Sequence, residues 1–78
     1  MSTLSNQILS IMRRRQVKGL TVGEIFDRIW AQGNTTPVYS SVRARVYELV
    51  NNGKLYGNGV RKDTISGYDA TTFVRPQQ

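Results

Sequence analysis

The chain contains no cysteine and no histidine. Without cysteine it has neither a disulfide framework nor a thiolate metal site, so a domain this short must be stabilised by packing alone. Without histidine it lacks the commonest general base, proton shuttle and metal ligand, which excludes hydrolase triads and zinc sites. We therefore expect no cofactor, and the absence of cysteine fits a reducing cytoplasm.

Long apolar runs are also missing. No segment approaches the roughly 20 apolar residues that a helix needs to span a bilayer. The polar start Met1-Ser2-Thr3 lacks the charged lead and the apolar stretch of a signal peptide. These features predict a soluble, cytoplasmic protein without a membrane partner.

Acidic residues are scarce, since 5 Asp and Glu stand against 11 Lys and Arg and give a formal charge of +6. This balance favours an anionic partner, nucleic acid above all. The 78 residues, 38% of them hydrophobic, have room for one compact core and no second domain. We predict a single domain over residues 1–75 and a short disordered tail over residues 76–78, which begins at a proline that ends any preceding strand.

The first segment predicts a helix with a basic end. Leu4, Ile8 and Ile11 recur at helical spacing, which indicates a helix over residues 4–16. Its end carries three consecutive arginines, Arg13, Arg14 and Arg15. Either these cations only complement the helix dipole, or they also reach a phosphate of a bound nucleic acid.

A capping box marks the start of a second helix. In Thr21-Val22-Gly23-Glu24 the threonine hydroxyl and the glutamate carboxylate can each satisfy a backbone N–H. The helix ends before Gly33, a residue type suited to a left-handed C-terminal conformation. Glu24 and Asp27 lie one turn apart, but their place near the helix start explains these carboxylates better than acid–base chemistry or magnesium binding does. We therefore do not expect an enzyme.

A third helix is predicted over residues 37–52. The motif Asn34-Thr35-Thr36-Pro37 combines a cap residue with a proline at the first helical position, and Gly53 follows the end. The apolar stripe of this helix contains Val38, Val42, Val46, Leu49 and Val50. The opposite face contains Pro37, Ser40, Ser41, Ala44 and Glu48, with Arg43 and Arg45 at its flanks.

The remainder of the chain predicts a β-hairpin, because residues 68–74 are rich in threonine and aromatic residues. Residues 54–62 and 68–74 form its strands, and residues 63–67 form its tip. Gly57 and Gly59 weaken the first strand or mark a bulge in it.

The order of three helices and a hairpin resembles the winged helix-turn-helix DNA-binding domains, in particular the small ones of prokaryotes and bacteriophages. The residues that look like the recognition-helix-to-wing signature are Ser41-Val42, Arg45-Val46, Leu49, Gly53 and Leu55. The resemblance covers nearly the whole chain and implies an α+β fold, a three-helix winged helix-turn-helix with a C-terminal two-stranded β-hairpin wing. The chain departs from the simplest pattern at residues 18–20, which leave room for only one or two residues of strand pairing.

The resemblance implies sequence-specific binding of double-stranded DNA by a small transcription regulator, with the third helix in the major groove and the hairpin on the neighbouring backbone or minor groove. Small side chains on the helix permit close approach, and arginine binds guanine or phosphate. The predicted contacts are Thr35 and Thr36 at phosphates, Ser40, Ser41, Arg43, Ala44 and Arg45 on the helix, and Arg61, Lys62 and Thr64 on the wing. A plainer interpretation of Arg45 is an exposed ion pair with Glu48.

Other functions fit the same composition. A winged-helix scaffold also serves as a protein–protein interaction module, here for a host or replication protein, since a fold does not fix a function. RNA binding requires a platform of exposed aromatics, and the four tyrosines do not line up as one. Phe26, Trp30 and Tyr47 are predicted as core or interface aromatics. A homodimer is compatible with the sequence, although no heptad repeat marks its interface.

Overall fold

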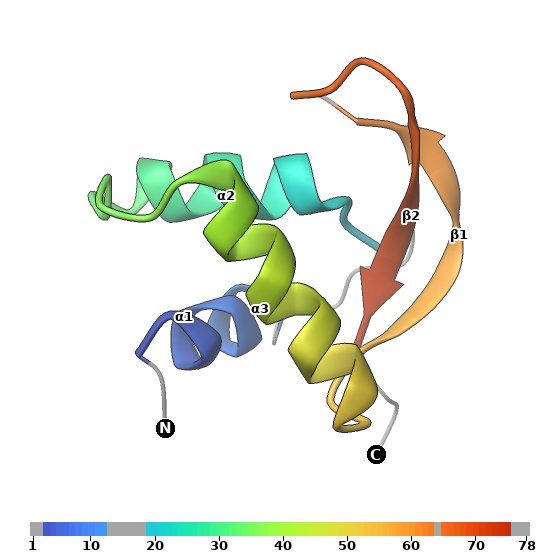
Figure 1. Ribbon diagram of the computed structural model, residues 1–78, viewed down its shortest axis with the longest axis horizontal. Helices are drawn as coiled ribbons and strands as arrows, with labels where there is room; N and C mark the ends of the chain where they lie inside the picture. The colour runs from blue at the N-terminus through green and yellow to red at the C-terminus, as the bar shows by residue number, and fades with distance from the viewer. Residues whose placement is uncertain (1–2, 13–18, 64, 76–78) are drawn as a thin grey trace.

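The computed structural model describes residues 3–12, 19–63 and 65–75, which form three helices followed by a β-hairpin (Figure 1). Helix α1 spans Thr3–Ile11, α2 spans Val22–Ala31 and α3 spans Tyr39–Asn51. Strands β1, Tyr56–Lys62, and β2, Asp69–Val74, pair antiparallel. This order confirms the predicted α+β fold class. The predicted end of the first helix, residues 13–16, and the predicted tail, residues 76–78, lie outside the described residues.

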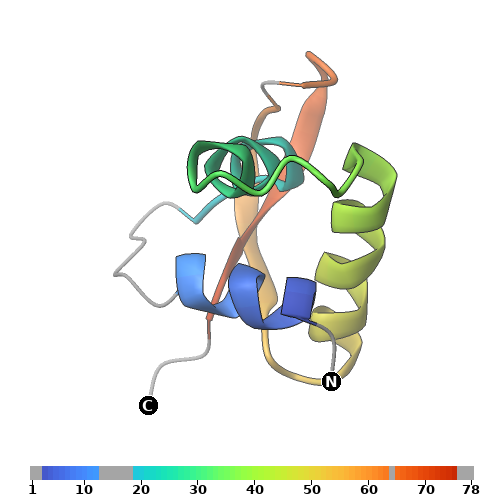
Figure 2. The same ribbon diagram turned by 90° about the vertical axis from the view of Figure 1, so that its left-hand side faces the viewer.

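The three helices pack around one hydrophobic core, and the hairpin covers one side of it. Helix α2 contacts α1, α3 and β2, and Figure 2 shows α1 and α2 beside α3 with the hairpin behind them. The fully buried side chains include Ile8 of α1, Ile25 and Ile29 of α2, and Val42 and Val46 of α3. Each such side chain stabilises the fold by roughly 1.5–3 kcal/mol. None of the described helices is long and apolar enough to cross a bilayer.

Helix α2 begins as the sequence predicts. The Thr21 side chain accepts the N–H of Glu24 at 3.2 Å, and Glu24 Oε1 accepts the N–H of Thr21 at 3.2 Å, which completes the capping box. The buried Thr21 hydroxyl also forms a hydrogen bond with the carboxylate of Asp63. At the other end Gly33 adopts a φ of 92°, a conformation that favours glycine.

We expect Thr21→Ala to lower the free energy of unfolding by about 2 kcal/mol, because the variant loses both the helix cap and a hydrogen bond to a buried carboxylate. Thr21→Ser keeps the hydroxyl and should lose less than half as much. Urea denaturation followed by circular dichroism measures both losses. Equal losses in the two variants would show that the methyl group stabilises this position and the hydroxyl does not.

Helix α3 starts two residues later than predicted. Its N-cap is Val38, which has an extended backbone with φ −93° and ψ 165°, and no side chain caps the first turn. Asn34 forms a local turn instead, since its side-chain oxygen accepts the N–H of Thr36 at 3.3 Å. The prediction that residues 34–37 open the helix is therefore wrong. Thr35 and Thr36 lie in the loop between α2 and α3, and Val38 is 59% exposed rather than part of the core.

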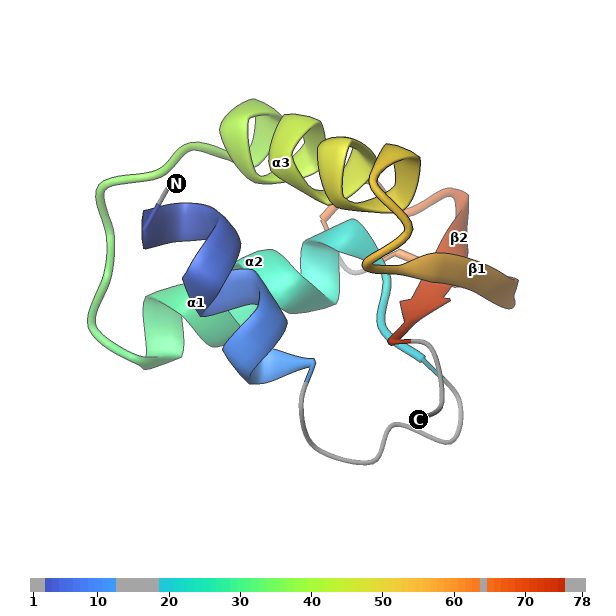
Figure 3. The ribbon, with the colours of Figure 1, turned by 90° about the horizontal axis from the view of Figure 1, so that it is seen from below.

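The hairpin gains one further residue of pairing from the segment before α2. β1 and β2 pair with a bulge between Gly57 and Gly59, one of the two predicted effects of these glycines. Leu20 adds a single antiparallel bridge to Phe73, through backbone hydrogen bonds of 3.0 and 2.8 Å. Figure 3 shows the start of α2 beside β2. At Gly19, with φ 74°, an added Cβ would lie 2.9 Å from the Phe73 carbonyl oxygen, so glycine permits this close approach.

Candidate nucleic-acid interface

Helix α3 buries one stripe of side chains and exposes the opposite one. Val42, Val46 and Leu49 are buried, as predicted. At 100° per residue, Ser40, Ala44 and Tyr47 therefore lie on the side that faces away from the core. All three residues are exposed. Because two of them are small, an approaching molecule can come close to the helix backbone there.

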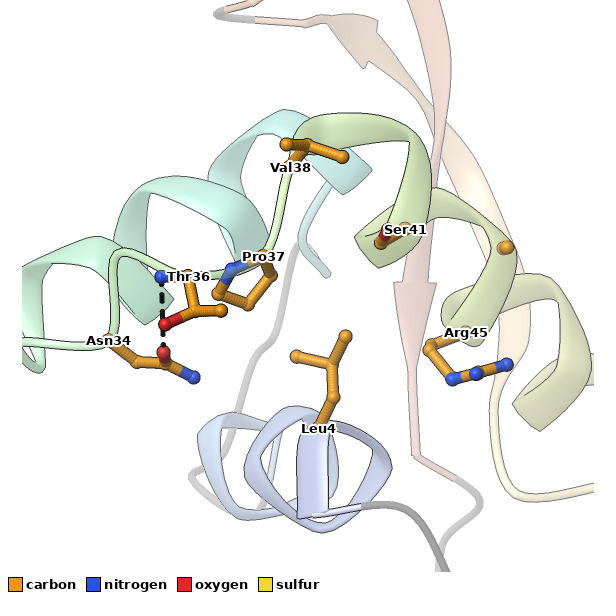
Figure 4. Close-up of a pocket in the computed structure, with 8 residues that line it drawn as sticks. Leu4, Asn34, Thr36, Pro37, Val38, Ser41 and Arg45 are labelled. Carbon is orange, nitrogen blue, oxygen red and sulfur yellow. Dashed lines mark hydrogen bonds between the residues drawn. The ribbon is translucent and has the colours of Figure 1, made fainter.

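On the side of α1, helix α3 borders an open hollow of about 730 Å³. Ser41 and Arg45 line this hollow from α3, and Leu4 points into it from α1 (Figure 4). Ser41 thus lies on a flank of α3 and not on its outermost face. Arg45 forms an ion pair with Glu48, with 2.6 Å between the nitrogen and the oxygen, and 38% and 57% of the two side chains are exposed. This ion pair is the plainer interpretation of Arg45 given in the sequence analysis. Exposed pairs of this kind contribute about 0–1 kcal/mol, so a phosphate can replace the carboxylate at low cost.

On the side of the wing, helix α3 carries a stacked arginine and tyrosine. The guanidinium of Arg43 lies over the Tyr47 ring, 5.5 Å from its centroid. Tyr47 in turn meets Phe73 edge-on, with ring centroids 5.9 Å apart. These residues line a groove of about 400 Å³ between α3 and β2, which Asp69 and Thr71 line from the wing. The stack holds the guanidinium near the helix while its N–H edge can still donate to an acceptor.

The two wing cations predicted to bind DNA have different surroundings. Arg61 Nε donates to Glu24 at 3.0 Å, and Arg61 Nη2 donates to the same carboxylate and to the Gly19 carbonyl. The hydrogen bond to Glu24 raises the pKa of Arg61. Lys62 is exposed and lies opposite Asp69 in the strand register. Arg61 therefore joins the wing to α2, whereas Lys62 faces solvent.

Four other residues named from the sequence have no described surroundings. Thr64 of the wing and the basic residues Arg13, Arg14 and Arg15 lie outside the described residues. Thr35 and Thr36 are exposed in the loop before α3, away from the helix N-terminus at which they were expected to bind phosphate.

Asp63 is a central residue that the sequence reasoning missed. It is 1% exposed, and its Oδ1 accepts the N–H of Gly23 at 2.8 Å. Its Oδ2 accepts the N–H groups of Ile65 at 3.2 Å and Ser66 at 3.1 Å, and the Tyr39 hydroxyl lies 3.5 Å from the same oxygen. An aspartate at the start of a turn often binds its own backbone, which is a signal for the local contacts. No pattern in the neighbouring sequence indicates that Asp63 also contacts α2 and α3.

The hydrogen bonds around Asp63 keep its carboxylate ionised. Burial by itself raises the pKa of Asp63, but hydrogen bonds from the Thr21 hydroxyl and from the N–H groups of Ser66, Gly23 and Ile65 outweigh it and lower the pKa below its usual value. The carboxylate lies at the N-terminus of α2, where the helix dipole favours negative charge. This helix end therefore already holds an anion that belongs to the chain.

Two glutamates bind arginines of the chain itself. Glu24 completes the capping box and binds Arg61, and Glu48 pairs with Arg45. Within the described ranges, no three acidic side chains gather closely enough to hold a metal ion.

The aromatic side chains are more exposed than the sequence suggested. Phe26 contacts Trp30 and Tyr39, with ring centroids 5.9 and 6.0 Å apart. Trp30 is 48% exposed and Tyr47 is 44% exposed. The prediction placed both residues either in the core or at an interface, and the core placement is wrong for both. Aliphatic residues such as Ile25 and Ile29 fill the core instead. On a helical wheel Tyr47 falls on the outer side of α3, a signal that was available in the sequence.

Comparison with known proteins identifies the fold. No protein-family model matches the sequence, and no curated protein shows significant similarity to it. Among solved structures, the ferric uptake regulator from Francisella tularensis, determined with iron, superposes with a TM-score of 0.75 over 99% of this chain, at 18% sequence identity. The fold is a winged helix. In winged-helix terms, α2 and α3 form the helix-turn-helix and the β1–β2 hairpin is the wing. The chain spans 53% of the length of that neighbour.

Proposed function

We propose that this protein binds double-stranded DNA sequence-specifically as a small transcription regulator, with α3 in the major groove and the wing on the adjoining backbone. The observation that carries the proposal is the surface of α3. Ser40 and Ala44 are small and exposed, so a partner can come close to the helix backbone there. Arg43 lies on the wing side of the helix, and Arg45 lies on the side of α1. The formal charge of +6 supports an anionic ligand. The structural neighbour is itself named a regulator.

The two arginines of α3 are assigned different roles. Arg43 stacks on Tyr47 and takes part in neither of the ion pairs found among the described residues, so its N–H edge is free to bind guanine. Arg45 is held by Glu48 and exchanges that carboxylate for a phosphate. Further contacts with the sugar-phosphate backbone of the DNA are assigned to Thr35, Thr36, Ser41, Lys62 and Thr64. Arg61, which was predicted as a contact, is left out because its guanidinium binds Glu24.

The proposal is tested by titrating labelled random-sequence duplex DNA at several salt concentrations and measuring fluorescence anisotropy. Each phosphate contact contributes roughly −0.9 to the slope of log affinity against log salt, so a slope of several units is expected. Arg43→Ala should weaken binding by about tenfold. Arg28→Ala is the matched control, because Arg28 is an exposed arginine of α2 beside the end of α1. Equal effects of the two variants would contradict the assigned surface.

We expect Glu48→Gln to raise duplex affinity about threefold, because the variant releases Arg45 and removes a negative charge from the proposed interface. The same titration measures the change. Asp27→Asn removes an exposed acid from α2 and should have a smaller effect. Weaker binding by Glu48→Gln would show that the ion pair itself is required for the complex.

A protein-interaction module is the second candidate, because the wing exposes apolar side chains. Val60, Ile65 and Tyr68 are 69%, 46% and 78% exposed. A surface of this kind suits a protein partner, such as a host or replication protein, better than it suits phosphates. Absence of duplex binding even at low salt would favour this candidate over DNA binding.

A further inference from the structure

The wing is joined to the helices at successive levels along its length. At its base the backbone of Phe73 pairs with Leu20, and further along the hairpin Arg61 binds Glu24. Beyond the end of β1, Asp63 accepts a backbone N–H from the first turn of α2. The first two contacts join the wing to α2 and to the segment before it. Asp63 also reaches α3, because its Oδ2 lies 3.5 Å from the Tyr39 hydroxyl.

The carboxylate of Asp63 connects the wing tip with both helices of the helix-turn-helix. Oδ1 binds Gly23 of α2, and Oδ2 lies beside the Tyr39 hydroxyl at the start of α3. The same Oδ2 accepts the N–H groups of Ile65 and Ser66, which orders the tip itself. Gly23 makes this approach possible, since a Cβ at that position would lie 2.4 Å from Oδ1. One buried side chain therefore relates the wing tip to α2 and α3 at the same time.

We propose that Asp63 is a positioning residue of the DNA interface, which sets the position of the wing relative to α3 and thereby the place where Lys62 meets the duplex. The inference rests on the DNA binding proposed above. Lys62 directly precedes Asp63 and is exposed. Asp63→Asn keeps one acceptor oxygen and replaces the other with an NH2 donor, so either the N–H of Gly23 or those of Ile65 and Ser66 lose their acceptor, and the link between the tip and α2 is broken. Lys62 would then have no defined place against the duplex.

The position of the wing is measured without DNA. The chain has no cysteine, so Asn51→Cys at the end of α3 and Tyr68→Cys at the wing tip give two unique spin-label sites, both exposed. Double electron–electron resonance should give a narrow distance distribution in this labelled background and a broad or displaced one when Asp63→Asn is added. Asp69→Asn is the matched control, because it removes an exposed acid from the same hairpin and should leave the distribution narrow.

The consequence for DNA binding is measured through Lys62. Lys62→Gln should reduce the magnitude of the salt slope by roughly 0.9 in the wild type and in the Asp69→Asn background. In the Asp63→Asn background, Lys62→Gln should change the slope little. Since both aspartate variants remove one negative charge, a difference between them reports the position of the wing and not its net charge.

Two results would overturn the inference: equal distance distributions in the Asp63→Asn and Asp69→Asn variants, or an undiminished effect of Lys62→Gln in the Asp63→Asn background. If the wild type binds no duplex, the proposed function fails, whereas the distance measurement still decides whether Asp63 positions the wing. If Asp63→Asn does not fold, Gly23→Ala replaces it, because the added Cβ displaces the same carboxylate from the side of α2.

Discussion

Replacing Asp63 by alanine is expected to lower the free energy of unfolding by about 3 kcal/mol, because buried N–H groups lose a charged acceptor. The N–H of Gly23 lies inside the interface between the wing and α2, where water cannot readily replace the carboxylate. Asp69→Ala, an exposed position on the same hairpin, should change stability by less than about 0.5 kcal/mol. Urea denaturation of both variants measures the difference, and a loss below about 1 kcal/mol for Asp63→Ala would contradict the role given to this contact.

Gly23→Ala provides a second route to the same contact. The added methyl group overlaps the Asp63 carboxylate, so we expect a loss of about 2 kcal/mol although alanine favours helix more than glycine does. In the Asp63→Ala background the overlap is gone, and the same substitution should be neutral or stabilising. Additive losses in this double-mutant cycle would show that the two residues do not act through one contact.

The lowered pKa of Asp63 predicts how stability changes with pH. A carboxyl group whose pKa is lower in the folded than in the unfolded state stabilises the fold when the pH is above its pKa in the unfolded state, which is near 3.8. That contribution is lost as the pH falls from this value through the lower folded pKa. The difference in stability between the wild type and Asp63→Asn should therefore be constant near neutral pH and shrink below about pH 4. A difference that stays constant in acid would show that the charge of Asp63 is not what stabilises the fold.

Ala44→Glu is expected to weaken duplex binding on the order of 100-fold, which corresponds to about 3 kcal/mol of like-charge repulsion at the interface. Ala44 lies on the exposed face of α3 between the two arginine flanks, so in the proposed complex a carboxylate there would meet the phosphates or base edges directly. Stability should change by less than about 1 kcal/mol, since the position is exposed and glutamate is a good helix former.

Ala44→Gln separates the size of the new side chain from its charge. Glutamine is nearly the same shape, so any effect that it shares with Ala44→Glu comes from the loss of close approach, and the remainder comes from the charge. Both variants are compared in the anisotropy titration used for Arg43. Unchanged binding by Ala44→Glu would remove this face of α3 from the proposed interface, whichever flank binds DNA.

The elements that sequence reasoning predicted correctly carry short-range signals. Thr21 and Glu24 specify the start of α2 between them, and the valine and leucine stripe of α3 specifies which side of that helix is buried. The glycine pair in β1 marks the bulge. Each of these signals acts over a few residues, so the local structure that it specifies does not depend on contacts with the rest of the fold.

The start of α3 shows where local signals compete. Both a proline at the first helical position and an Asn34 turn are compatible with residues 34–37, and the observed Asn34 turn delays the helix to Tyr39. The same delay moves Thr35 and Thr36 away from the helix end. The sequence contains both preferences, and in the structure the Asn34 turn prevails.

The sequence by itself determined the class of fold, the basic character of the chain and the buried stripe of the helix proposed to bind DNA, because composition and periodicity encode them directly. Only the tertiary structure decided which charged groups are available at the surface. Arg61 binds Glu24 across 37 residues, and Asp63 binds Gly23 across 40 residues. No local pattern reports such partners, since they meet only when the wing folds against the start of α2.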